Sequence, residues 1–370
     1  MEYREGRHGR WRRWICGSMV TVQHRRRWDE LHLLGGLRAG THREGHLYVC
    51  PCATKGQVLT FPQVTDTRDY YRTIKSIGLD LLGHDEHQIN DDGEPSQSIW
   101  YQFDLASSRK SPSAGSLTGR LRIVDTWSGI SNTCRNSGRS DTAELAKHIA
   151  FGLRACELRL RDCSSEYLWQ NEYAVFKGTH PGGRFSNLKS FDLDLALHSL
   201  LTEMGTARDY LAHFISRFIF QDPKPVDAMA ALYKRIKKRQ PSNTSASQEV
   251  ADEVMTICDP ERAEGWMAKL TEYRNIIIHR APLSGLSKHH FLTAERTAVG
   301  DTSLVRIFFP IPADPFTNDA VASVDALTHF LDFQRRLRGF ARLIADCSGV
   351  APTLVHITDK DIIRPEGAIT

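Results

Sequence analysis

Apolar side chains recur at helical spacing through the second half of the chain. From Leu193 to Phe218 they stand alternately four and three residues apart, which is the spacing of the buried face of an amphipathic helix. Helical spacing of apolar residues predicts helices over residues 141–160, 192–220, 226–239, 248–257, 260–279 and 321–344. The C-terminal half is therefore expected to be mainly helical.

Alternation of apolar and polar residues predicts strands elsewhere in the chain. In the first half, the predicted strands cover residues 47–61, 99–105 and 121–127. Later, residues 289–296 and 303–311 flank the turn sequence Val299-Gly300-Asp301 and predict a hairpin between helices. The sequence thus combines helices with short antiparallel strands.

His180-Pro181-Gly182-Gly183 is the strongest boundary signal in the chain. We therefore expect an α+β protein with four parts. They are a basic, poorly ordered arm over 1–45, a small mixed α/β module over 46–180, a helical domain with the inserted hairpin over 185–350, and a tail over 351–370.

The composition of the 370 residues, 41% hydrophobic and 25% charged, is that of a globular chain long enough for two domains. No stretch approaches the roughly 20 apolar residues that cross a bilayer, and no apolar core follows the N-terminal arginines. We expect a cytoplasmic protein without membrane contact. Cys50 and Cys52 lack a nearby second cysteine pair; a zinc site with His42 and His46 is the alternative to two reduced thiols. We predict no metal and no cofactor.

The net charge of +4 is mild, but the basic residues are clustered. Eight arginines crowd the first 30 residues beside three tryptophans, which favours a disordered extension, with an RNA-contacting arm as the alternative. A second cluster joins a later arginine as candidate RNA-binding residues: Lys234, Arg235, Lys237, Lys238, Arg239 and Arg280.

Arg274, Asn275 and His279 lie at the end of the predicted helix 260–279, which Pro282 prevents from continuing. Arginine binds phosphate with a permanently charged planar fork, and histidine accepts and donates protons near neutral pH. Asn275 and His279 are four residues apart, so a hydrogen bond between them is expected to orient the imidazole. These residue types favour cleavage of RNA without a metal ion.

Two other arginine–histidine pairs have a similar spacing. Arg27 and His32 fall in the basic arm, where a solvated charge run explains them. Arg208 and His213 flank the apolar stripe of a long helix and are expected on its surface. Arg274 instead falls on an apolar stripe, where a charge is costly unless it is paired or faces a polar cleft. We therefore take 274–279 as the candidate site; a buried arginine that ties helices together is the structural alternative.

The sequence Arg274-Asn275-Ile276-Ile277-Ile278-His279 resembles the signature of the HEPN domain family, helical proteins that include RNA-cutting toxins and defence effectors. The resemblance covers about residues 192–346 and implies an antiparallel helical bundle. It also implies an endoribonuclease that leaves 2′,3′-cyclic phosphate and 5′-hydroxyl ends and works as a homodimer, with RNA as substrate and an antitoxin or regulatory protein as a further partner. The alternative is a non-catalytic HEPN-like protein that binds a nucleotide or RNA or forms a dimer.

Within this resemblance, His279 would act as general base or acid, Arg274 would stabilise the charge that develops on phosphate, and Asn275 would orient one of them. Some HEPN proteins that a partner nucleotidyltransferase modifies carry a tyrosine two residues after the histidine. That position is Ala281 here, which does not support such a modification. The hairpin before the last helix also departs from the minimal HEPN bundle.

Overall fold

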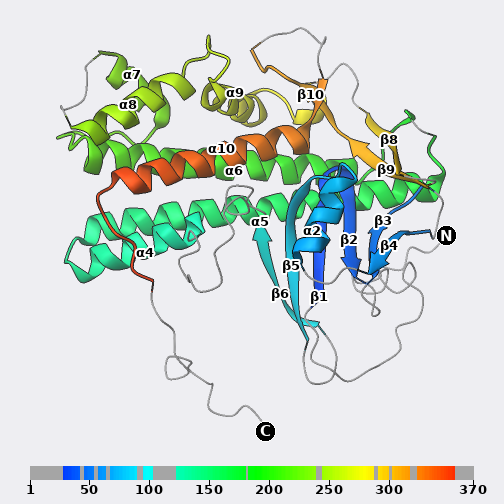
Figure 1. Ribbon diagram of the computed structural model, residues 1–370. Helices are drawn as coiled ribbons and strands as arrows, with labels where there is room; N and C mark the ends of the chain where they lie inside the picture. The colour runs from blue at the N-terminus through cyan, green and yellow to red at the C-terminus, as the bar shows by residue number, and fades with distance from the viewer. Residues whose placement is uncertain are drawn as a thin grey trace, which may run out of the picture. The chain divides into compact units, whose positions relative to one another are not determined.

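The computed structural model describes residues 28–41, 46–53, 57–63, 67–89, 95–102, 122–180, 182–238, 244–286, 291–299, 302–316 and 323–354. The predicted mixed α+β class is confirmed, because these residues form helices and antiparallel sheets (Figure 1). The chain divides into two compact units, each assembled from three separate segments. Unit 1 contains Met1–Phe103, Arg161–Leu193 and His289–Pro310, and unit 2 contains Asp104–Leu160, Asp194–Lys288 and Ile311–Thr370.

Unit 1 is built on a six-stranded antiparallel sheet of order β4-β3-β2-β1-β5-β6. The strands are β1 (Trp28–Leu33), β2 (Leu37–Thr41), β3 (His46–Cys50), β4 (Leu59–Gln63), β5 (Leu81–Ile89) and β6 (Pro95–Gln102), with the short turn η1 (Leu34–Gly36) between β1 and β2 and the helix α2 (Thr67–Ser76) before β5. Alternate residues of β1 and β2 pack with Ile74 of α2 in one apolar core. This apolar core covers one face of the sheet.

The opposite face of the same sheet is polar and also buried. His32, Arg38 and Asp85 are 2%, 3% and 3% exposed, and their partners include Ser164 on α5 (Ser140–Lys177). The expected disordered arm over 1–45 is therefore wrong for residues 28–41, which are strands and a turn; residues 1–27 lie outside the described ranges. Leu31, His32 and Leu33 alternate as expected for a strand with one apolar and one polar face, but this alternation covers only a few residues after a run of arginines, so the sequence did not indicate the strand.

The predicted hairpin is confirmed as the antiparallel pair β8 (Leu292–Val299) and β9 (Thr302–Phe308), which β7 (Arg184–Phe185) extends to three strands. The prediction that this hairpin belongs to the helical domain is wrong, because the hairpin is part of unit 1. Asn171 of α5 donates to the carbonyls of Gly35, Gly36 and Val305 and so joins the hairpin to the β1–β2 turn. The expected boundary near residue 180 consequently does not separate two domains.

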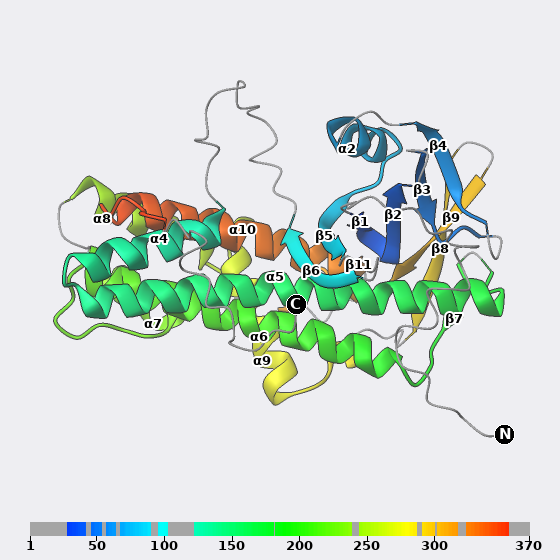
Figure 2. The ribbon, with the colours of Figure 1, turned by 90° about the horizontal axis from the view of Figure 1, so that it is seen from below.

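Unit 2 is mainly helical (Figures 1 and 2). Its elements are α4 (Ile123–Asn136), the first part of α5, most of α6 (Ser190–Phe214), the π-helical turn η2 (Ile215–Ile219), α7 (Met229–Lys238), α8 (Ser245–Ile257), α9 (Trp266–His279), the turn η3 (Leu283–Gly285), β11 (Ser323–Asp325), which pairs with β10 (Pro310–Pro312), and α10 (Ala326–Cys347). The amphipathic helix α10 contacts α4, α8 and α9. Trp127 of α4 donates to the Ala341 carbonyl of α10 at 3.2 Å and packs edge-on against Phe214 of α6.

Residues 121–127 were expected to be a strand, and this prediction is wrong. Ile123, Trp127 and Ile130 are buried on one face of the helix α4, with Thr126 and Cys134 beside them. The alternation of Leu121, Ile123 and Trp127 in so short a window also fits a helix, and packing against α10 decides between the two. Of the expected tail, residues 351–354 lie along α4, where Thr353 donates to the Gly129 carbonyl. Within the described ranges, no helix has the length and apolar character needed to cross a membrane.

Candidate functional site

The motif lies at the C-terminal end of α9, as the sequence predicted. The helix ends at His279, the Arg280 and Ala281 amides both donate to the Ile276 carbonyl, and Pro282 follows. Asp194 of α6 then accepts from the amides of Leu283 and Ser284 at 3.2 and 3.3 Å. The chain is therefore fixed directly after the motif, which gives the end of α9 a defined position.

One side of α9 faces the core. Trp266, Met267, Leu270, Tyr273, Ile276 and Ile277 are buried, whereas Ile278 is 40% exposed. At 100° per residue, Arg274, Asn275, Ile278 and His279 form one continuous outward arc. On the core side, the hydroxyl of the buried Tyr273 donates to the Pro312 carbonyl. Arg274 lies at the edge of the buried face.

Arg274 is half-buried and lacks an acidic partner among the described residues. Its Nε is fully buried and makes no hydrogen bond in the described part of the chain. The side chain crosses α6 at Gly205, where an added Cβ would stand 2.5 Å from Arg274 Cδ and 2.7 Å from Nε. An arginine that ties helices together would have its donors occupied. The geometry therefore favours an arginine that is held ready for an anion.

Asn275 is half-buried and His279 is exposed at the end of the same arc. The expected hydrogen bond between their side chains is not formed within the described residues. An exposed imidazole at a helix end can reach a ligand from solvent, which a general acid or base requires. The asparagine amide remains beside it on the helix, and it can contact a phosphate or the imidazole once a ligand is bound.

The two other arginine–histidine pairs, Arg208–His213 and Arg27–His32, are the decoy motifs with which the candidate site is compared. Arg208 is 4% exposed and fully engaged: its Nε and Nη2 donate to Asp209 at 2.9 Å, and its Nη1 donates to Thr271 of α9 at 2.7 Å. The surface position expected for it is wrong, and it instead joins α6 to α9. Arg27 lies outside the described residues, and His32 is buried in β1. Of the two described arginines, Arg208 has a carboxylate partner, and Arg274 has none among the described residues.

The candidate RNA-binding cluster on α7 is partly used within the protein. Arg235 donates to Asp222 at 3.1 Å, while Lys234, Lys237 and Lys238 are exposed and Arg239 lies outside the described residues. Arg280 pairs with Glu272 at 2.6 Å on the outer side of α9. The exposed lysines are thus the part of this cluster that is available to phosphates.

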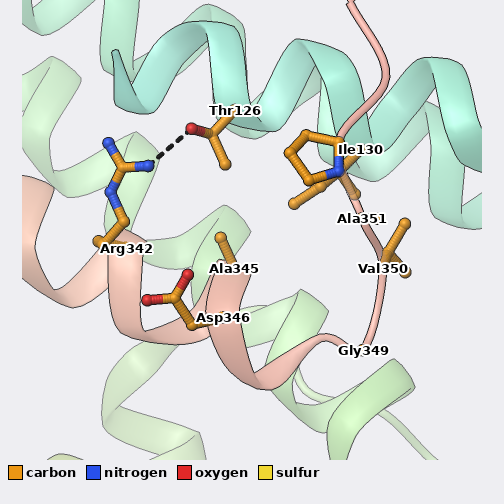
Figure 3. A pocket seen from close by; sticks show the side chains of 9 residues that line it. Thr126, Ile130, Arg342, Ala345, Asp346, Gly349, Val350 and Ala351 are labelled. Carbon is orange, nitrogen blue, oxygen red and sulfur yellow. Dashed lines mark hydrogen bonds between the residues drawn. The ribbon is translucent and has the colours of Figure 1, made fainter. Parts of the chain in front are cut away.

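A cavity of about 400 Å³ lies away from the motif, between α4, α10 and residues 349–352. Figure 3 shows Arg342 of α10 reaching Thr126 of α4, with Asp346 one helical turn further along. Its lining residues do not include Arg274, Asn275 or His279, so this cavity does not provide the cleft expected around the motif.

The structure also brings together residues that the sequence analysis did not connect. Glu30 and His32 of β1 and Asp85 of β5 place one ligand atom each within 4.8 Å of the others. Asp85 is far from Glu30 and His32 in the sequence, and no motif spacing indicates that the three residues meet. Cys50 and Cys52 are free thiols, as expected, but His42 lies outside the described residues, so the alternative zinc site is not described as a whole.

Comparison with known proteins returns no relative: no protein-family model, no curated protein and no solved structure matches the chain. The function is therefore inferred from the residues of the site.

Proposed function

We propose that this protein is a metal-independent endoribonuclease of HEPN type, with a HEPN-like helical bundle in unit 2 and Arg274, Asn275 and His279 as its catalytic residues. The observation that carries the proposal is the outward arc of α9, which combines an arginine that no described carboxylate neutralises with an exposed histidine. Arg208, which has a similar arginine–histidine spacing, is fully engaged by Asp209 and Thr271 and supports the choice between the two motifs.

The reaction is attack of an RNA 2′-hydroxyl on the adjacent phosphorus. A bond forms between the 2′-oxygen and phosphorus, and the bond from phosphorus to the 5′-oxygen breaks, giving a 2′,3′-cyclic phosphate and a free 5′-hydroxyl. His279 accepts the 2′-proton or supplies a proton to the leaving 5′-oxygen. Arg274 stabilises the extra negative charge on the phosphate oxygens, and Asn275 orients the phosphate or the imidazole.

One histidine cannot serve as base and acid in the same step, and two copies of the motif would provide both. We therefore include a homodimer in the proposal, with the motif-bearing ends of α9 close together. The half-exposed Ile278 between Asn275 and His279 supports this, since it offers apolar contact area at the motif. A toxin or defence role, held in check by an antitoxin or regulatory partner, and a cytoplasmic location belong to the same proposal.

The test is cleavage of total RNA by the purified protein in EDTA, followed by chemical analysis of the new ends. Wild-type protein should produce cyclic phosphate and 5′-hydroxyl ends, and His279→Ala should not. His213→Ala is the matched control, because His213 ends the decoy motif on α6. Expression of the wild-type protein alone should also be toxic, unlike that of the Arg274 and His279 variants. Equal cleavage by folded His279→Ala would favour the non-catalytic RNA-binding or dimerisation protein instead.

A further inference from the structure

The buried polar face of the unit 1 sheet brings two carboxylates and an imidazole together. Glu30 of β1 stands directly opposite Asp85 of β5, and His32 is two residues further along β1. Residues two apart on a strand, and residues directly opposite on neighbouring strands, point to the same side of a sheet. The three side chains accordingly converge, with one ligand atom from each within 4.8 Å of the others.

We propose that Glu30, His32 and Asp85 bind one divalent transition-metal ion. This site lies within unit 1, and the inference goes beyond the proposed ribonuclease and does not depend on it. Metal ligands at about 2.0 to 2.2 Å from a zinc ion stand roughly 3 to 4 Å apart. Glu30, the half-buried member of the three, lies at the accessible side and can close the remaining distance.

The facing carboxylates of Glu30 and Asp85 favour a cation between them. Like charges directly opposite on paired strands repel each other, and Asp85 is buried as well. Arg161 of α5 now pairs with Asp85 at 3.0 Å, and its side chain is 31% exposed. A divalent ion would neutralise both carboxylates at once, and Arg161 can then turn toward solvent. The metal-bound set of ligands would be electrically neutral.

The surroundings of His32 also fit a metal ligand. Its Nδ1 lies 3.2 Å from Ser164 Oγ, and its Nε2 lies 3.2 Å from Asp85 Oδ2. With the ion bound, a proton on Nδ1 would be donated to Ser164, and the Nε2 lone pair would be available to the ion. Arg38 holds Ser164 by donating to its Oγ and its carbonyl, both at 3.1 Å. Metal-binding histidines are commonly oriented by such a hydrogen bond on the second ring nitrogen.

A neutral imidazole is the form of histidine that binds metal ions. One imidazole and two carboxylates suit zinc, manganese or iron better than calcium, which prefers six or more oxygen ligands.

The same residues also form a serine–histidine–aspartate chain, but its geometry does not support hydrolysis. Ser164 is 0% exposed in the middle of α5, beneath the sheet of the same unit. A nucleophile must reach its substrate, and this hydroxyl has no exposed surface. In the proposed metal site, Ser164 instead positions His32.

The experiment uses the full-length protein after removal of metals with EDTA and dialysis. Titration with Zn²⁺ should show saturable binding of one ion per chain and a higher melting temperature, because the ion binds the folded state. Glu30→Gln and Asp85→Asn should each weaken binding by more than about 10-fold. Asp80→Asn and His46→Gln are the matched controls, because each changes a residue of a ligand's type elsewhere in unit 1, and Cys50→Ser tests for a thiolate ligand. All three variants should retain wild-type affinity.

Co²⁺ identifies the ligand type. The absorption spectrum of the Co²⁺-bound protein should show the visible bands of an ion bound by nitrogen and oxygen. It should show no thiolate charge-transfer band. Circular dichroism of the metal-free variants shows whether they fold, and Glu30→Gln is the variant least coupled to the core. Absence of saturable Zn²⁺ binding by the wild-type protein overturns the proposal. So does wild-type affinity in folded Glu30→Gln, or a thiolate band that Cys50→Ser removes.

Discussion

Gly205 of α6 provides the space in which Arg274 of α9 lies, since an added Cβ would stand 2.5 Å from Arg274 Cδ. Alanine is about 1 kcal/mol better than glycine inside a helix, so Gly205→Ala does not weaken α6 itself. It should displace Arg274 and lower RNA cleavage by about 10-fold or more, because small misplacements of catalytic groups are costly. Cleavage rate and melting temperature should be measured together.

The control for this variant is Gly339→Ala in α10, where an added Cβ meets no atom within 4 Å. It should raise stability slightly and leave cleavage unchanged. If Gly205→Ala cleaved RNA as fast as Gly339→Ala, the position of Arg274 would not matter for the reaction.

His279→Ala should lower RNA cleavage by about 10²- to 10⁴-fold, the usual range for a lost acid or base. The side chain is exposed at the helix end, so its removal should leave the melting temperature nearly unchanged. Cleavage and thermal melting of His213→Ala should both resemble the wild type. A selective loss of activity in His213→Ala would assign the reaction to the other motif.

Arg208→Ala should lower the free energy of unfolding. It removes hydrogen bonds to Asp209 and Thr271 and leaves a partly buried carboxylate, so we expect a loss of about 2 kcal/mol in the free energy of unfolding. Arg274→Ala should abolish cleavage with a smaller loss of stability, because only the arginine stem packs against α6. Chemical denaturation of the two variants tests this order, and the reverse order would contradict the assignment of Arg208 as the structural arginine.

RNA cleavage should persist in excess EDTA, since the proposed mechanism needs only a histidine, an arginine and an amide. Chelation would also remove an ion from the site proposed in unit 1, so Glu30→Gln should be assayed in parallel and should cleave RNA like the wild type. Loss of activity in EDTA that Mg²⁺ or Mn²⁺ restores would refute the mechanism.

His329 should make unit 2 less stable in acid. Its Nε2 is buried without a hydrogen bond among the described residues. Burial lowers the pKa of His329 to about 4. The positive charges of Lys269 and Arg336 lower this pKa further, whereas the negative charges of Asp332 and Asp314 raise it. The unfolded chain binds a proton below its ordinary pKa of about 6.5, whereas the folded chain does not until about pH 4. The stabilising contribution is thus complete above about pH 6.5 and is lost as the pH falls toward 4.

The matched variant is His329→Phe, which keeps an aromatic ring beside Tyr273 and Phe333. The difference in melting temperature between this variant and the wild type should grow as the pH falls from about 6.5. A constant difference between pH 7 and pH 4 would show that His329 is not the group responsible.

The sequence by itself determined the elements that local periodicity specifies. The apolar spacing from Leu193 onward predicted α6, and the paired alternating segments around Gly300 predicted the hairpin of β8 and β9. Pro282 correctly marked the end of α9, because a proline cannot continue a helix. Each of these features depends on residues that are neighbours in the sequence.

Tertiary structure alone decided which polar residues have partners and which segments share a unit. Arg208 and Arg274 have similar local sequences, and only the positions of Asp209, Thr271 and Gly205 distinguish a structural arginine from one without a described carboxylate. His32 and Asp85 meet through the pairing of β1 with β5, which joins distant segments. Hydrogen bonds and compensating charges form between residues that are neighbours in space, so periodicity along the sequence does not predict them.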